Sequence, residues 1–248
     1  MSKILALDFD GVICDSIDEC LLVSYHAFHE KTKIENIDFS NIQEGIIKDF
    51  KKYRYLIGPA KDFYFLWKSI FEYHKTSTDI EKIYFKLKKS DMNRELPFVK
   101  RFYTLREQLK NKYFDNWVLL NPFYKGIKNI LSKIQDNKTL FIITAKDTNS
   151  VFDLMKENNI DIQHSHIYGR EKNLDKRHLF KQMIKYHGMS KKDIVFVDDN
   201  ISNVIDVIEI GIVSYLATWG YNSHTDRIEA ENNNIVSLKF NEFQSIIS

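Results

Sequence analysis

The chain has 248 residues, of which 44% are hydrophobic and 28% charged, a composition typical of a globular protein. Its formal net charge of +2 is too small for a dedicated nucleic-acid-binding protein, so no nucleic-acid partner is expected. No apolar run approaches the roughly 18 residues of a membrane-spanning helix, so no membrane partner is expected either. The length suits one large domain or a core domain with an insertion.

The cysteines and the N-terminal segment bear on the cellular compartment. Cys14 and Cys20 form neither a disulfide framework nor a metal-binding motif. Asp8 and Asp10 interrupt the only apolar segment near the N-terminus, so no signal peptide is expected. We therefore expect a cytoplasmic protein with reduced thiols.

The first half of the chain begins with one strand and continues with helices. The apolar run 4–7 predicts a short buried strand. A helix is predicted next, because Ser16 and Glu19 have the spacing of a capping box. From about residue 40 to 113, the apolar residues of every periodic segment recur at helical intervals.

The pattern changes after about residue 120. A helix is predicted over 121–137, and from there short apolar strands alternate with helices. The strands are expected at 140–144, 166–169, 193–199, 211–218 and 234–238, and the helices from Asn149, Asp175 and Ile201. Such alternation is typical of a parallel sheet covered by helices.

These elements predict an α/β fold with an insertion. The first strand finds partners only after residue 138, so the fold class is a Rossmann-like three-layer sandwich with a central parallel sheet and an inserted all-helical domain. The charged residues divide in a similar way. Residues 33–115 contain 18 Lys/Arg and 12 Asp/Glu, whereas the rest of the chain contains 18 Lys/Arg and 22 Asp/Glu. A basic helical lid over an acidic sheet domain favours an anionic substrate, although solvated helices also carry lysines.

Carboxylates follow two of the predicted strands. Asp8 and Asp10 end the first strand, where alternate residues share a face, and Asp198 and Asp199 end the strand at 193–199. Ligands of an open parallel sheet bind beyond these carboxyl ends. Clustered carboxylates are tolerated when a divalent cation lies among them, and hard oxygen ligands suit Mg²⁺.

A hydroxyl and a lysine are expected at the same edge. Thr144 ends the strand at 140–144, and Lys172 and Lys176 follow the strand at 166–169. With the metal offsetting charge repulsion, Asp8 is free to act as a nucleophile. The hydroxyl and a lysine would hold phosphate oxygens during transfer.

Four segments resemble the motifs of the haloacid dehalogenase superfamily, in the superfamily's order. They are DFDGVICDS, FIIT, a lysine before or at the start of a helix, and IVFVDDN. The resemblance implies a catalytic core over 1–15 and 121–248. The insertion over 16–120 resembles the helical cap of phosphoglycolate phosphatase-like members.

The resemblance also implies a role for each matching residue. Asp8 would attack phosphorus, and Asp10 would act as general acid and then as base. The metal ligands would be Asp8, Asp10 through its backbone carbonyl, Asp199 and Asp198. The phosphate-binding residues would be Thr144, Ala145 and either Lys176 or Lys172, of which Lys176 is favoured because it starts a helix.

The sequence departs from the superfamily's motifs at two positions, and one stretch of the insertion resembles part of the cap. Asn203 stands where the superfamily usually has an acidic residue, and no proline follows the lysine of the third motif. The stretch KYRYLIGPAKDFYFLW has an Arg-x-x-x-Gly pattern similar to a substrate-facing loop of the cap. Arg54 and Lys61 are therefore candidates for substrate specificity, the alternative being helix packing and solvated lysines.

The function expected from these residues is a Mg²⁺-dependent phosphatase. It would hydrolyse a small phosphorylated metabolite through an aspartyl-phosphate, as a monomer or homodimer. One alternative is a sugar phosphomutase with the same aspartate pair. Another is a receiver-like regulatory protein that accepts phosphate on Asp8.

Overall fold

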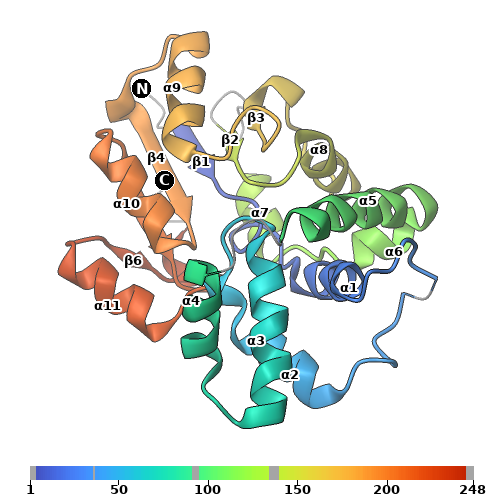
Figure 1. Cartoon of the computed structure of the whole chain (residues 1–248). Helices are drawn as coiled ribbons and strands as arrows, with labels where there is room; N and C mark the ends of the chain where they lie inside the picture. The colour runs from blue at the N-terminus through green and yellow to red at the C-terminus, as the bar shows by residue number, and fades with distance from the viewer. Residues whose placement is uncertain (1–3, 36, 91–94, 134–139, 244–248) are drawn as a thin grey trace. The chain divides into compact units, whose positions relative to one another are not determined.

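The computed structural model describes residues 4–35, 37–90, 95–133 and 140–243. The chain divides into two compact units, one made of Met1–Asp15 with Pro122–Ser248 and the other of Ser16–Asn121. Figure 1 shows the elements of both units, of which the first holds all the described strands. Among the described residues, no helix is both long and apolar enough to cross a membrane.

A parallel sheet forms the centre of the first unit. Its described strands number six, in the order β3-β2-β1-β4-β5-β6, and every neighbouring pair is parallel. The strands are β1 (Ile4–Leu7), β2 (Leu140–Ile143), β3 (Ile167–Tyr168), β4 (Ile194–Asp198), β5 (Val213–Ala217) and β6 (Ser237–Leu238). This is the strand order of a doubly wound Rossmann-like sheet, which confirms the predicted fold class.

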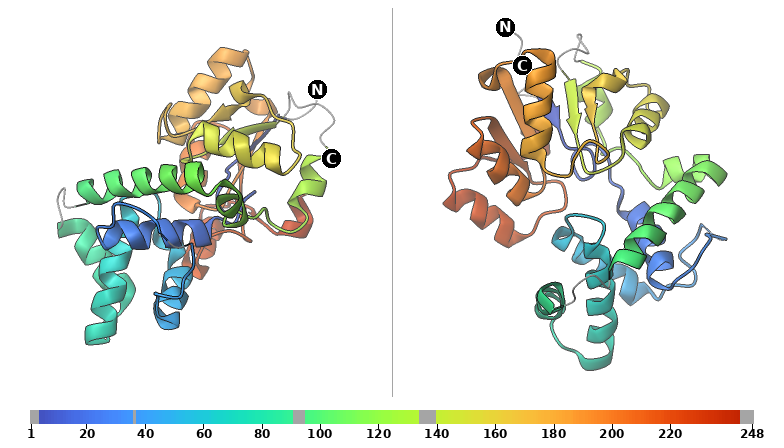
Figure 2. Two further views of the ribbon diagram at one scale, coloured as in Figure 1. Left: turned by 90° about the vertical axis from the view of Figure 1, so that its right-hand side faces the viewer. Right: turned by 45° about the horizontal axis from the view of Figure 1, so that its top comes forward.

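Helices surround this sheet, as Figure 2 shows. They are α7 (Ile127–Leu131), α8 (Thr148–Glu157), α9 (Lys176–His187), α10 (Ile201–Glu209) and α11 (His224–Asn232), with short 3₁₀ turns η3 (His164–His166), η4 (Lys191–Asp193) and η5 (Phe240–Glu242). Phe180 of α9 and Val207 of α10 are buried in one cluster with Ala6 and Phe196 of the sheet. Because both faces of a parallel sheet are covered, its strands are apolar almost throughout.

The helix predicted over 121–137 is much shorter in the structure. Only Ile127–Leu131 is helical, and 134–137 lie outside the described residues. The preceding segment runs beside the loop after β1 instead: Asp15 N donates to Pro122 O at 2.8 Å, and Tyr124 N donates to Ile13 O at 3.0 Å. These hydrogen bonds take backbone groups that a helix would have used.

Two predicted strands are also shorter than expected. Of the strand predicted over 166–169 only Ile167–Tyr168 pairs with β2, and His166 belongs to the 3₁₀ turn η3. Of the strand predicted over 234–238 only Ser237–Leu238 pairs with β5. Both lie at an edge of the sheet, where a strand has a single neighbour and short strands are common.

The second unit is built from helices packed around aromatic rings. The helices are α1 (Ile17–Phe28), α2 (Glu44–Lys52), α3 (Asp62–Thr76), α4 (Ile80–Ser90), α5 (Leu96–Lys112) and α6 (Phe114–Leu119), with the 3₁₀ turn η1 (Arg54–Leu56). The ring of Phe50 stacks on Trp67 at 4.8 Å and on Phe63 at 5.8 Å, and Phe63 stacks on Phe102 at 5.5 Å. The helical character predicted for residues 40–113 is confirmed for the described part of that stretch, and residues 91–94 lie outside it.

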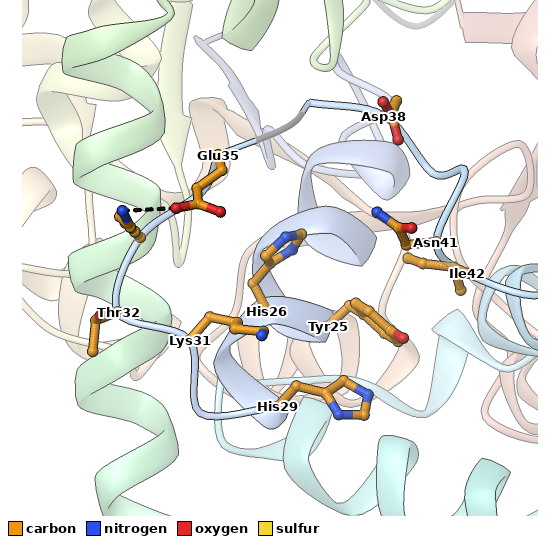
Figure 3. Close-up of a pocket in the computed structure, with 10 residues that line it drawn as sticks. Tyr25, His26, His29, Lys31, Thr32, Glu35, Asp38, Asn41 and Ile42 are labelled. Carbon is orange, nitrogen blue, oxygen red and sulfur yellow. Dashed lines mark ion pairs between the residues drawn. The ribbon is translucent and has the colours of Figure 1, made fainter.

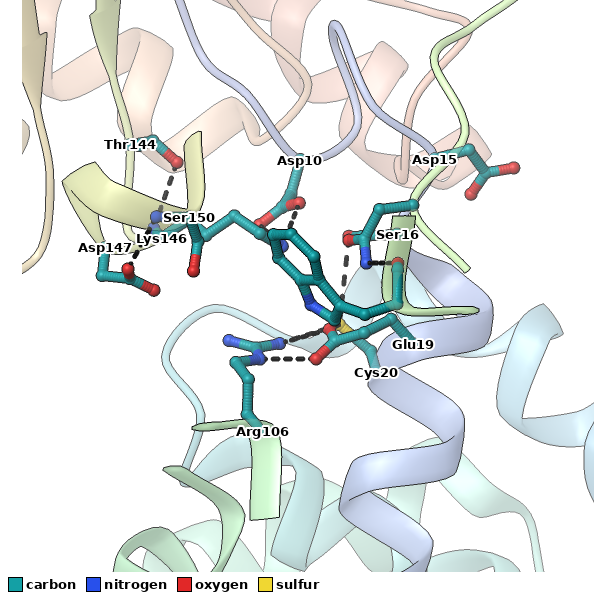
Figure 4. Close-up of polar contacts among 12 residues, drawn as sticks. Asp10, Asp15, Ser16, Glu19, Cys20, Arg106, Thr144, Lys146, Asp147 and Ser150 are labelled. Carbon is teal, nitrogen blue, oxygen red and sulfur yellow. Dashed lines mark hydrogen bonds and ion pairs between the residues drawn. The ribbon is translucent and has the colours of Figure 1, made fainter. Parts of the chain in front are cut away.

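The capping box predicted at the start of α1 is wrong. Ser16 makes no side-chain capping bond, and its hydroxyl lies 3.9 Å from Cys20 Sγ. Glu19 is instead buried and accepts two hydrogen bonds from Arg106 of α5, both at 2.7 Å (Figure 4). A buried carboxylate forms stronger hydrogen bonds with a charged guanidinium than with the backbone N–H at the start of its own helix.

We predict that Arg106→Met destabilises the protein strongly. The substitution would leave Glu19, whose side chain is 0% exposed, without its cation, at a cost of about 3–5 kcal/mol in the free energy of unfolding. Urea denaturation of the purified protein measures this.

Lys51→Met is the matched control. Lys51 of α2 pairs with Asp18 of α1, the residue next to Glu19, but the two side chains are 42% and 39% exposed. Exposed pairs contribute at most about 1 kcal/mol, so little change is expected. Equal effects of the two substitutions would contradict the role assigned to the buried pair.

Candidate active site

Asp8 lies at the centre of the sheet's carboxyl edge. It follows β1, and its backbone N–H donates to Val197 O of β4 at 2.9 Å, which holds the residue between the two strands. Its carboxylate is buried and lies 2.9 Å from Lys176 Nζ. In this strand order the edge between β1 and β4 is the topological switch point, where α/β proteins bind ligands.

Lys176 connects two of the predicted carboxylates. It is the first residue of α9, whose start is capped by Asp175, and its ammonium contacts both Asp8 and Asp198. Burial by itself lowers the pKa of Lys176, but the carboxylates of Asp198 and Asp8 outweigh that effect and raise it. Lys176 is therefore a buried cation at the site.

Three carboxylates meet at this edge. One oxygen each from Asp8, Asp198 and Asp199 lies within 4.8 Å of the others, and all three residues are buried. Asp198 accepts further hydrogen bonds from the backbone N–H of Asn200 at 2.8 Å and from Asn203 Nδ2 at 3.1 Å. Asn203, the departure noted from the sequence, thus orients Asp198.

Asp199 is enclosed by two glycines. A Cβ on Gly11, whose φ is +93°, would lie 2.0 Å from Asp199 Oδ2, and a Cβ on Gly220 would lie 2.4 Å from Asp199 Cβ. The backbone N–H of Tyr221 donates to Asp199 Oδ2. Only residues without a side chain leave room for this carboxylate, which explains the glycine directly after Asp10.

Asp10 has a partner that the sequence analysis did not identify as a functional residue. The Lys146 ammonium lies 3.1 Å from Asp10 Oδ1 and 3.5 Å from Oδ2, and the Lys146 side chain is 0% exposed (Figure 4). A lysine two positions after a strand-end threonine was the available signal. Its meaning was hidden because Asp10 is 136 residues away.

The remaining phosphate-binding candidates lie at two places. Thr144 is buried at the end of β2, where its Oγ1 accepts a hydrogen bond from Lys146 N at 3.1 Å, and Ala145 beside it is exposed. Lys172 Nζ donates to Ile167 O at 2.7 Å and lies 4.0 Å from the Tyr168 ring centre. Lys172 therefore covers the outer edge of β3, and the structure brings only Lys176 to Asp8.

The two specificity candidates belong to the helical unit. Arg54 is buried there, donates from Nη1 to Ile57 O at 3.3 Å and lies over the Phe63 ring. Lys61 is exposed at the start of α3. The packing explanation therefore suits Arg54, whereas the Lys61 ammonium is accessible.

The electrostatics of the acidic group favour a divalent cation. With Asp8, Asp10, Asp198 and Asp199 ionised, Lys146 and Lys176 supply two positive charges against four negative ones. Burial, the largest effect, raises the pKa of Asp8 to about 7, and Asp198 adds to the rise while Lys176 opposes it. Asp8, Asp198 and Asp199 are buried hard oxygen donors, and a divalent cation such as Mg²⁺ would favour the ionised form of Asp8 among them.

The chain belongs to the haloacid dehalogenase-like hydrolase family. The model of that family matches residues 5–216, which include every strand-end residue described above. The resemblance stated from the four motifs is thereby confirmed. No curated protein matches the chain.

Solved structures share the fold over nearly their whole length. A predicted phosphatase from Clostridium acetobutylicum is 18% identical, with 100% of this chain and 98% of that chain covered and a TM-score of 0.59. A predicted phosphoglycolate phosphatase from Haemophilus somnus is 15% identical, with 100% and 98% covered and a TM-score of 0.64. A haloacid dehalogenase-like hydrolase from Streptococcus pneumoniae is 16% identical, with 99% and 97% covered and a TM-score of 0.60.

We predict that the two candidate lysines respond very differently to substitution. Lys176→Met removes the cation that Asp8 and Asp198 share and should lower the free energy of unfolding by about 3–5 kcal/mol in metal-free buffer. Lys172→Met removes one hydrogen bond to a carbonyl and should cost about 1–2 kcal/mol. Urea denaturation compares them, and a larger effect of Lys172→Met would argue against the charge balance described here.

Proposed function

We propose that the protein is a Mg²⁺-dependent phosphatase that hydrolyses a small phosphorylated metabolite through an aspartyl-phosphate. One observation carries the proposal: Asp8 is buried at the switch point of the sheet, beside the Lys176 ammonium and two further carboxylates. Membership of a hydrolase family and the phosphatase names of structures with the same fold support it.

The first half of the proposed reaction transfers the phosphoryl group to the protein. An oxygen of the Asp8 carboxylate attacks phosphorus, and the bond from phosphorus to the ester oxygen breaks. The protonated Asp10 carboxyl gives its proton to that leaving oxygen, which departs as an alcohol. Lys176 and Thr144 hold the phosphoryl oxygens as charge develops on them.

The second half releases phosphate. The Asp10 carboxylate takes a proton from a water molecule, the water oxygen attacks phosphorus, and the bond between phosphorus and Asp8 breaks. Asp8 is regenerated, and the products of one cycle are an alcohol and inorganic phosphate. Asp10 serves both halves, because it gives a proton in the first and regains one in the second.

Asp8, Asp199 and the backbone carbonyl of Asp10 would hold the metal in this proposal, with Asp198 beside them. When bound, Mg²⁺ would offset the repulsion between the carboxylates and the anionic substrate. Because the Asp198 oxygens already accept from Lys176, Asn200 and Asn203, we assign Asp198 chiefly to positioning Lys176.

The helical unit would select the substrate. We place it in the role of a cap, with Lys61 as a candidate contact to the substrate, and propose a cytoplasmic protein that acts alone or as a homodimer. Arg54 would act indirectly, by supporting the turn η1 and the segment after it.

The test of this function is phosphate release from a panel of phosphorylated metabolites and p-nitrophenyl phosphate. We predict Mg²⁺-dependent turnover that EDTA abolishes and that Asp8→Asn lowers at least about a thousandfold, because the nucleophile is lost. Asp175→Asn is the matched control, since asparagine caps a helix as well as aspartate does, and should keep nearly full activity. Full activity of Asp8→Asn, or turnover that survives EDTA, would refute the proposed mechanism.

We also predict that Lys146→Met lowers kcat about ten- to a hundredfold with a smaller change in KM. The substitution removes the buried ammonium that positions the Asp10 carboxylate, and misplacing a proton-transferring group slows the chemical step. Steady-state kinetics on the best substrate measure both constants. Lys146→Arg should recover part of kcat, and exposed Lys192→Met should change neither constant. A Lys146→Met enzyme with wild-type kcat would exclude this positioning role.

A further inference from the structure

A pocket of about 590 Å³ lies within the helical unit, beside the C-terminal end of α1. Figure 3 shows side chains from the end of α1 surrounded by side chains of the loop that leads to α2. The residues from the helix end are Tyr25, His26 and His29, and the loop residues are Lys31, Thr32, Lys33, Glu35, Asp38, Asn41 and Ile42. None of them belongs to the acidic site of the sheet.

The frame of this pocket is held by α5. Gln108 Nε2 donates to Thr32 O at 3.2 Å, and Arg101 Nε donates to Ala27 O at 3.0 Å. Farther along the loop, Ile34 and Ile42 are buried in the unit. Hydrogen bonds and apolar contacts therefore anchor the loop on both sides of the pocket.

The carboxylates around the pocket already have partners. Glu35 pairs with Lys33 at 2.7 Å, and Asp38 accepts hydrogen bonds from both the backbone N–H and the hydroxyl of Ser40. Glu30, next to the pocket, pairs with Arg101 at 3.4 Å. These negative groups are thus engaged with neighbours on the same loop or on α5.

The basic side chains of the pocket have fewer hydrogen-bond partners than its carboxylates. Among the residues that the structure describes, no carboxylate or carbonyl lies within hydrogen-bond distance of the Lys31 ammonium, which attracts the nearby Glu35 carboxylate only at longer range, and neither ring nitrogen of His29 has a hydrogen-bond partner. His26 Nδ1 lies 2.9 Å from Leu22 O, which can only accept, so Nδ1 carries a proton, and Nε2 accepts in the neutral ring and donates only in the cationic ring.

His29 lies near two other basic side chains of the pocket, Lys31 and His26. Burial, first, and then Lys31 and His26 lower the pKa of His29, so the neutral imidazole is favoured in the absence of a ligand. The His29 ring also lies 4.4 Å from the Tyr25 ring. An anion in this place would gain from the ammonium and from imidazole N–H groups, with aromatic surface next to it.

We propose that this pocket binds a phosphate group, either as inorganic phosphate or as part of a small metabolite. A phosphate offers acceptor oxygens to Lys31 and His29 and, as the monoanion, a hydroxyl that His26 Nε2 can accept, whereas an ionised carboxylate offers two acceptor oxygens only. The site is separate from the one that would carry out hydrolysis, and its occupancy does not depend on turnover.

The test is a titration followed at the histidine ring signals by ¹H–¹³C NMR. Inorganic phosphate is added to the wild type and phenyl phosphate to Asp8→Asn, at constant ionic strength maintained with NaCl. The signals of His26 and His29, assigned with His26→Gln and His29→Gln, should shift together and saturate with one Kd. The other histidines should keep their positions and report that the fold is intact.

Two lysine variants give the matched comparison. Lys31→Gln should weaken binding at least about tenfold, because it removes a charge-assisted hydrogen bond. Lys33→Gln, whose ammonium is already paired with Glu35, should change the Kd less than about twofold. Tighter binding of phenyl phosphate assigns the site to a phosphorylated metabolite, and equal or weaker binding assigns it to inorganic phosphate.

Three results would overturn the proposal. They are the absence of saturable shifts at His26 and His29, equal shifts with NaCl alone, and a Kd that Lys31→Gln leaves unchanged. Because the signals come from the pocket itself, loss of this site would leave the proposed phosphatase activity untouched, and a failed activity assay would leave the binding result standing.

Discussion

The contact of one buried ammonium with two carboxylates is the interaction on which the described site depends. Lys176 reaches Asp8 after β1 and Asp198 at the end of β4, and it joins both strands to the start of α9. Without a cation at this position, adjacent strands would end in buried like charges, which repel and lose hydration. The helix start, the strand order and the acidic residues are thus parts of one electrostatic arrangement.

The backbone around Asp199 gives that third carboxylate the space and the hydrogen bond that it needs. Gly11 and Gly220 leave space for its carboxylate, and the Tyr221 N–H donates to it. The group of Asp8, Asp198 and Asp199 retains more negative than positive charge even with Lys176 in contact. A hard divalent cation would supply the positive charge that the two buried lysines leave missing.

The helical unit is stabilised in a different way, because its helices pack on one another and not on a sheet. Stacked rings around Trp67 and Phe50 supply its interior, and the Glu19–Arg106 pair joins α1 to α5. The loop after α1 is anchored at its edges but leaves Lys31 and His29 directed to a pocket of its own. A unit placed in the role of a substrate-selecting cap could thus also hold a phosphate group by itself.

The sequence alone determined the class of fold and the main acidic residues of the candidate site. Alternation of apolar strands with helices and the position of Asp8 and Asp199 at strand ends are local properties, so they can be read from neighbouring residues. Tertiary structure decided which partners those residues have. Lys146 was missed, Lys176 was separated from Lys172, Glu19 turned from a helix cap into a buried ion pair, and Arg54 was enclosed by packing. These contacts join residues far apart in the chain, and they depend on strand order and helix packing that no local pattern encodes.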